Sequence, residues 1–163
     1  MRHVFFSFHY ADVFRVNVVR NLWVRRGGPA PAGYADRSMW EAERTRHGPA
    51  LKRKIRDALH GTSVTVVLIG AETASRSWVD FEIRESWERG SGLLGVSIHG
   101  IRCARSGTTS RRGANPFRSV KVPDAHGRER SLARVVPIYD WWDDRGEERF
   151  GDWVEAAARE AGR

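Results

Sequence analysis

Hydrophobic residues recur along the chain in two spacings, which together predict strands that alternate with helices. Short apolar runs at residues 3–8, 64–69, 93–98 and 135–139 have the length and β-branched content of buried strands. Between these runs, apolar residues recur at every fourth position, which is typical of a helix with one buried face. The pattern predicts an α/β fold in which a central parallel sheet carries helices on both faces.

Four segments have the character of helices, and three of them carry an apolar stripe that we expect to pack on the sheet. The stripes are Phe14, Val18 and Leu22 in the first helix, Leu51, Ile55 and Leu59 in the second, and Val79, Ile83 and Trp87 in the third. The closing helix is expected at about residues 147–161. Asp12 and Ser77 stand at two helix starts, where a side-chain oxygen can cap free backbone amides.

Residues 99–130 interrupt the alternation of strands and helices. This stretch is polar and rich in Gly, Ser and Arg, which predicts a long surface loop with a small hairpin. No internal repeat or linker is visible. We therefore expect a single domain over residues 1–163, with a core formed by about 2–98 and 135–163.

Composition places the chain among globular proteins. It has 163 residues, of which 40% are hydrophobic and 29% are charged. The start of the chain lacks the pattern of a signal peptide, and no apolar run approaches the roughly 18 residues of a membrane span. Cys103 is the single cysteine, so neither an internal disulfide nor a cysteine-based metal site is expected. These features predict a cytoplasmic protein.

The chain is strongly basic, with a net charge of +8. The densest basic group lies in the interrupting stretch and comprises Arg102, Arg105, Arg111, Arg112 and Arg118. Such a surface can bind phosphates, but no nucleic-acid-binding motif accompanies it, so attraction of an anionic dinucleotide is the preferred interpretation. We expect this group to lie outside the binding pocket, because no predicted strand ends within it.

Ligands of open parallel sheets bind beyond the carboxyl ends of the strands. That rule selects three segments, which are Ser7 to Asp12, the loop containing Asp36, Ser38 and Trp40, and Gly70 to Glu82. They supply hydroxyls, aromatic rings, a His and carboxylates, which suit a nucleotide pocket.

Glu82 is a candidate catalytic acid or base, since it falls one helical turn after Trp78 on a helix that follows a buried strand. Each candidate also has an ordinary structural interpretation. Glu82 can be a solvated surface charge, Ser7 and Asp36 can bond nearby backbone, and His9 can be a surface residue. Trp40 and Trp78 can serve in packing.

Long motifs along the chain resemble a known family. The stretch GTSVTVVLIGAETASRSWVDFEIRESW contains a buried strand, then S-x-W, then three residues and a Glu. This pattern resembles the third strand and following helix of TIR domains. With VFFSFHYADVFRVNVVRNLW and DRSMW, it resembles the TIR-like family of bacterial Thoeris antiviral systems that includes the ThsB proteins. The resemblance covers residues 2–117.

The resemblance implies a flavodoxin-like TIR fold and an enzyme that cleaves NAD without a metal or other cofactor. Glu82 maps onto the catalytic glutamate of TIR domains, near the ribose whose bond is cleaved. The expected substrate contacts are Phe6, Ser7, Phe8, His9, Tyr10, Asp36, Trp40 and Trp78. Val79 departs from the pattern, because many TIR domains carry Cys there.

The resemblance also implies a role in antiphage defence. The product would be a cyclic or conjugated ADP-ribose signal that activates a separate effector, with a phage-derived trigger and a homo-oligomer left open. The region after the second strand lacks the proline-containing signalling loop of animal receptors, which disfavours adaptor-type signalling. The alternative is a TIR-fold interaction module without catalysis.

Overall fold

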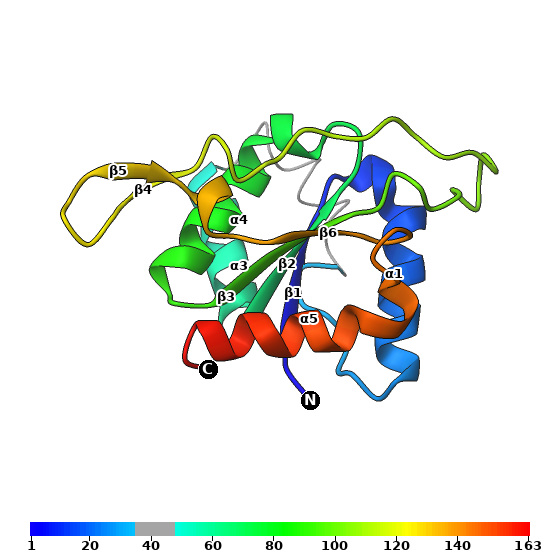
Figure 1. Ribbon diagram of the computed structural model, residues 1–163, viewed down its shortest axis with the longest axis horizontal. Coiled ribbons are helices and arrows are strands. Elements are labelled where there is room, and N and C mark those ends of the chain that lie inside the picture. The colour runs from blue at the N-terminus through cyan, green and yellow to red at the C-terminus, as the bar shows by residue number, and fades with distance from the viewer. Residues whose placement is uncertain (35–47) are drawn as a thin grey trace.

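The computed structural model describes residues 1–34 and 48–163. Its centre is a parallel sheet of β1 (Val4–Ser7), β2 (Val64–Ile69), β3 (Gly92–Ser97) and β6 (Ile138–Asp140), in the order β1-β2-β3-β6. All carboxyl ends therefore meet at one edge, which is uppermost in Figure 1, whereas both chain termini lie near the opposite edge.

Helices cover both faces of the sheet, as the apolar pattern predicted. Figure 1 shows α5 (Gly146–Glu160) crossing in front of the strands, with α1 (Val13–Arg25) at the right. On the other face lie α3 (Gly48–Leu59) and α4 (Ser77–Glu88). Alternate strand residues serve the two sides, so that Val66 and Leu68 pack toward α1 and α5 while Val67 and Ile69 pack toward α4. The α/β prediction is confirmed.

The stripe predicted for α1 is wrong at Phe14 and Val18, although Leu22 does pack against the core, because the helix buries a different face. Phe14 and Val18 are 36% and 37% exposed, whereas Val16, Val19 and Trp23 are buried. Both sets have helical spacing, so periodicity alone does not choose between them. The stripes predicted for α3 and α4 are confirmed, with Trp87 only partly buried at the end of the second.

The two expected N-caps are also wrong. Asp12 does precede α1, but its side chain makes no capping hydrogen bond and pairs with Arg15 instead. Ser77 is the first residue of α4 rather than its cap, and Arg76 occupies the cap position. At α1 the ion pair with Arg15 engages the Asp12 carboxylate, and at α4 the extended backbone that a cap residue adopts falls at Arg76, one position before Ser77.

The last strand is shorter than predicted. A short 3-10 helix, η3 (Leu132–Arg134), precedes it, and the amides of Val135 and Val136 donate to the Leu132 carbonyl. These two residues are therefore engaged in a turn, so the strand spans Ile138–Asp140 rather than 135–139. The expected hairpin is present as β4 (Lys121–Pro123) and β5 (Glu129–Ser131), which project from the body in Figure 1.

Residues 99–118 return to the sheet and do not project away from it, and three of the arginines expected to lie outside the binding pocket, Arg111, Arg112 and Arg118, line cavities at the sheet edge. This segment crosses the carboxyl edge of the strands, above β6 in Figure 1. Phe117 is fully buried against β2, β3 and α4, and Gly113 approaches the Gly70 carbonyl so closely that a β-carbon would overlap it. The segment therefore lies on the carboxyl edge of the sheet, where ligands of open parallel sheets bind.

Replacing Gly113 with Ala should destabilise the protein by about 1–3 kcal/mol, since the added methyl meets backbone rather than a movable side chain. Urea denaturation measures the effect. The matched control is Gly151→Ala in α5, where nothing lies within 4 Å of the added carbon and a gain of about 0.5–1 kcal/mol is expected. An unchanged Gly113→Ala midpoint would show that the segment does not rest on the sheet.

Candidate active site

Ser7 and Glu82 meet at the carboxyl end of β1. Ser7 is the last residue of that strand, and Glu82 lies in the second turn of α4. The Ser7 hydroxyl donates a hydrogen bond of 2.5 Å to Glu82 Oε2, and both residues are 0% exposed. A carboxylate expected on the rim is thus enclosed, and a hydroxyl from the sheet orients it.

A second polar contact holds the same part of α4. Thr65 Oγ1 on β2 lies 2.7 Å from Ser86 Oγ, and the Ser86 hydroxyl donates to the Glu82 carbonyl, also at 2.7 Å. All three residues are buried. The Thr65–Ser86 hydrogen bond ties β2 to α4 one turn after Glu82. The Glu82 carboxyl group is therefore positioned by a helix and a sheet rather than by a loop.

A crevice of about 220 Å³ opens beyond β1 and β2. Its lining residues are His9, Ala11, Asp12, Arg15, Ala71, Glu72, Ser110 and Arg111. The helix after β1 packs on one face of the sheet and the helix after β2 packs on the other. This position is therefore the topological switch point at which ligands of open parallel sheets bind.

Asp12 and Arg15 form a buried ion pair at the crevice wall. Arg15 Nη1 lies 3.3 Å from Asp12 Oδ1, and the same guanidinium donates to the carbonyls of Ile101 at 2.9 Å and Thr108 at 3.0 Å. The Asp12 carboxylate abuts Gly70 so closely that a β-carbon there would overlap it. Arg15 therefore joins α1 to the segment that crosses the sheet edge.

The groups around Asp12 shift the pKa of its carboxyl group in opposite directions. Burial raises the pKa of Asp12 above its ordinary value of 3.8, and this outweighs the lowering by Arg15 and His9, while Glu72 adds a smaller upward effect. His9 lines the crevice, with Nε2 4.0 Å from Glu72 Oε2 and Nδ1 accepting the Ala11 amide at 3.4 Å. The crevice thus combines groups of both signs.

Other predicted contacts lie in different surroundings. Phe6 and Phe8 are fully buried in the core, where their rings contact Phe150 and Tyr34 respectively. Tyr10 is 43% exposed on the 3-10 helix η1 (Tyr10–Asp12) and does not line the crevice. The side chains of Phe6 and Phe8 are engaged in packing, so a substrate role for them stays a prediction.

Trp78 packs on the α3 side of α4, edge-on to Phe81 with ring centroids 6.3 Å apart. Its buried Nε1 has no hydrogen-bond acceptor among residues 1–34 and 48–163. The predicted residues Asp36, Ser38 and Trp40 lie outside the described residues. The structure therefore brings together Ser7 and Glu82, and it places His9, but neither of those two residues, on the lining of the crevice.

Three lining residues, Arg15, Ser110 and Arg111, were missed by reasoning from the sequence. Arg15 falls one helical turn after Asp12, and this spacing was the signal that could have suggested an ion pair. Ser110 and Arg111 lie more than ten residues beyond the end of β3 at Ser97, so the strand-end rule did not select them. Their positions depend on the return of the chain across the sheet.

Comparison with known proteins gives the family. Residues 5–102 match the family model described as Thoeris protein ThsB, TIR-like domain. The ThsB1 protein of Bacillus cereus (strain MSX-D12), provisionally named a cyclic ADP-D-ribose synthase, is 35% identical over 190 residues. The match covers 94% of this chain and 98% of that protein. The chain belongs to the ThsB TIR-like family. The resemblance inferred from the motifs is confirmed.

The ThsB family match includes Ser7, Asp12, Arg15 and Glu82, but it ends at residue 102. Ser110 and Arg111, which complete the crevice, lie beyond it. This ThsB-family chain therefore builds one wall of its candidate site from a segment that the family model does not describe.

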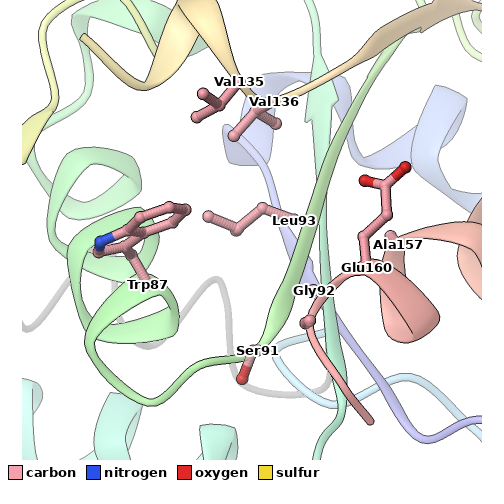
Figure 2. Close-up of a pocket in the computed structure, with 9 residues that line it drawn as sticks. Trp87, Ser91, Gly92, Leu93, Val135, Val136, Ala157 and Glu160 are labelled. Atoms are coloured by element: carbon pink, nitrogen blue, oxygen red, sulfur yellow. The ribbon is translucent and has the colours of Figure 1, made fainter. Parts of the chain in front are cut away.

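A separate cavity of about 210 Å³ lies at the opposite edge of the sheet, where β3 begins (Figure 2). Trp87 and Leu93 point toward one another there, below Val135 and Val136. None of the predicted site residues lines this cavity, so it is not the candidate active site of this ThsB-family protein.

No group of three or more His, Cys, Asp and Glu residues in 1–34 and 48–163 is arranged to hold a metal ion. Within the same ranges, every helix is too short or too polar to cross a membrane.

Proposed function

We propose that this protein processes NAD and releases an ADP-ribose-derived signal, cyclic or conjugated, that activates a separate effector in antiphage defence. The observation that carries the proposal is the Ser7–Glu82 contact, which holds an oriented carboxyl group at the carboxyl end of β1, the edge of the sheet at which the crevice opens. The provisional name of the Bacillus relative supports the same chemistry. In this proposal NAD is the substrate, and no metal or other cofactor takes part.

Glu82 would act on the bond between nicotinamide and ribose. As that bond breaks, the ribose acquires oxocarbenium character, and a nearby carboxylate stabilises the developing positive charge. Nicotinamide leaves with the bonding electrons, and a nucleophile on the same ADP-ribose or on a second molecule forms the new bond to the anomeric carbon. Ser7 would act as a positioning residue, since its hydroxyl orients the Glu82 carboxyl group.

Access to Glu82 bears on when the protein is active. Because Glu82 is 0% exposed, its carboxyl group reaches a substrate only after neighbouring groups have moved. We infer that the structure represents a resting form with low activity. A trigger that appears during infection would then act by stabilising the open form.

The test compares uninfected and phage-infected cells that carry the protein. Mass spectrometry of lysates should show, after infection, loss of NAD together with free nicotinamide and an ADP-ribose derivative. Purified protein incubated with NAD and infected lysate should reproduce this product. Unchanged NAD in both experiments, together with tight binding of a protein partner, would favour the interaction module.

A further inference from the structure

A second pocket lies at the same edge of the sheet as the candidate active site, over β2, β3 and β6. It has a volume of about 340 Å³, and its lining residues are Ile69, Ser97, Arg112, Gly113, Ala114, Asn115, Arg118 and Ile138. We call it the arginine pocket. The segment 110–115 separates it from the crevice, with Arg111 lining one and Arg112 the other.

The arginine pocket has an unbalanced positive charge. Arg112 and Arg118 have no ion-pair or hydrogen-bond partner for their side chains within residues 1–34 and 48–163, and no lining residue is acidic. By contrast, Arg15 in the crevice is neutralised by Asp12. Both arginines are exposed residues that line one cavity, and guanidinium groups are suited to bidentate contacts with phosphate oxygens.

The backbone around the two arginines is anchored in the core. Phe117 is fully buried, and the Ser131 hydroxyl lies 3.2 Å from the Phe117 carbonyl and 2.9 Å from the Arg118 carbonyl. Asn115 Oδ1 accepts the Phe117 amide at 2.8 Å, which fixes the orientation of its side chain. The backbone that carries the two arginines is therefore anchored to the core, which lowers the entropic cost of ordering it when a ligand binds.

We propose that the arginine pocket binds the diphosphate group of a nucleotide. The choice of NAD or its ADP-ribose product as that nucleotide rests on the proposed function. Ser97 on β3 lies two strands from Ser7 on β1, so the pocket wall is roughly 10 Å across the sheet from the Ser7–Glu82 contact. A diphosphate lies several bonds from the anomeric carbon of its ribose, so one dinucleotide can span the two places.

Calorimetric titration of the full chain tests the assignment with ADP-ribose, inorganic pyrophosphate and adenosine. Arg112→Gln/Arg118→Gln should raise the Kd of the first two ligands by at least about thirtyfold and leave adenosine unaffected. The matched control is Arg105→Gln/Arg130→Gln, which removes the same charge from two exposed arginines outside the pocket and should change Kd less than about threefold.

Equal weakening by the two double variants would overturn the assignment, since it would indicate only the general positive field. Undetectable binding of both phosphorylated ligands to the wild-type chain would also overturn it. Phosphate binding that depends on Arg112 and Arg118, with no NAD cleavage after triggering, would support the pocket and contradict the proposed function. NAD cleavage after triggering, together with unchanged binding of the phosphorylated ligands by Arg112→Gln/Arg118→Gln, would support the proposed function and contradict the pocket assignment.

Discussion

Glu82→Gln should lower triggered NAD cleavage by at least about a thousandfold, which corresponds to roughly 4 kcal/mol of transition-state stabilisation. The substitution keeps the size and shape of the side chain, and the Ser7 hydroxyl remains beside it. It removes the negative charge that would stabilise the developing oxocarbenium ion. Production of the ADP-ribose derivative, measured by mass spectrometry in infected lysates, should fall to background.

Glu85→Gln is the matched control for this variant. Glu85 lies on the same helix but forms an ion pair of 2.8 Å with the exposed Arg56, outside the crevice. Its loss should leave activity within about threefold, since exposed ion pairs contribute little. Ser7→Ala should give an intermediate loss, about tenfold to a hundredfold in kcat, if Ser7 only positions the carboxyl group. Wild-type signal levels from Glu82→Gln would remove Glu82 from catalysis.

Arg15→Ala should destabilise the protein by about 3–5 kcal/mol, because it leaves the buried Asp12 carboxylate and two carbonyl groups without their partner. In a domain of this size, the loss corresponds to a melting temperature lower by on the order of 10 °C. Thermal unfolding followed by circular dichroism measures the shift. Arg25→Ala, which removes an exposed arginine from the same helix, should melt within about 2 °C of wild type.

The pH dependence of Arg15→Ala follows from the raised pKa of Asp12. Removing Arg15 removes the largest effect that lowers this pKa, so the pKa rises further above 3.8. A carboxyl group with a raised folded-state pKa lowers stability above that pKa, and the deficit shrinks as the pH falls through it toward 3.8. Asp12→Asn in the Arg15→Ala background should recover part of the stability at neutral pH. A deficit that neither lower pH nor this second change reduces would contradict the ion-pair explanation.

Elements with an unambiguous pattern were predictable from the sequence. The runs at 64–69 and 93–98 are long and apolar, so they could only be strands buried on both faces, and the structure places β2 and β3 there. The spacing of Leu51, Ile55 and Leu59 left a single apolar face for α3. The motif around Trp78 and Glu82 identified the family, because long motifs in the right order depend on residue identity rather than on packing.

Where two sets of apolar residues in one helix both had helical spacing, the sequence could not show which set is buried. In α1, the stripe of Phe14 and Val18 and the stripe of Val16, Val19 and Trp23 are both helical. The buried stripe is decided by contact with α5 and the sheet, and it includes Arg15, whose charge is acceptable only because Asp12 and two carbonyls surround it.

The sequence by itself determined the α/β class, most of the elements, the family and the choice of Glu82 as the candidate catalytic residue. Only the tertiary structure decided that Glu82 is enclosed and bonded to Ser7, and that residues 110–118 line the two cavities at the carboxyl edge of the sheet. The reason is physical. Ser7 and Glu82 are 75 positions apart, and the return of the chain over β2 depends on Phe117 entering the core and on the close approach of Gly113 to Gly70. Contacts of this kind arise from packing between distant segments, which no local spacing encodes.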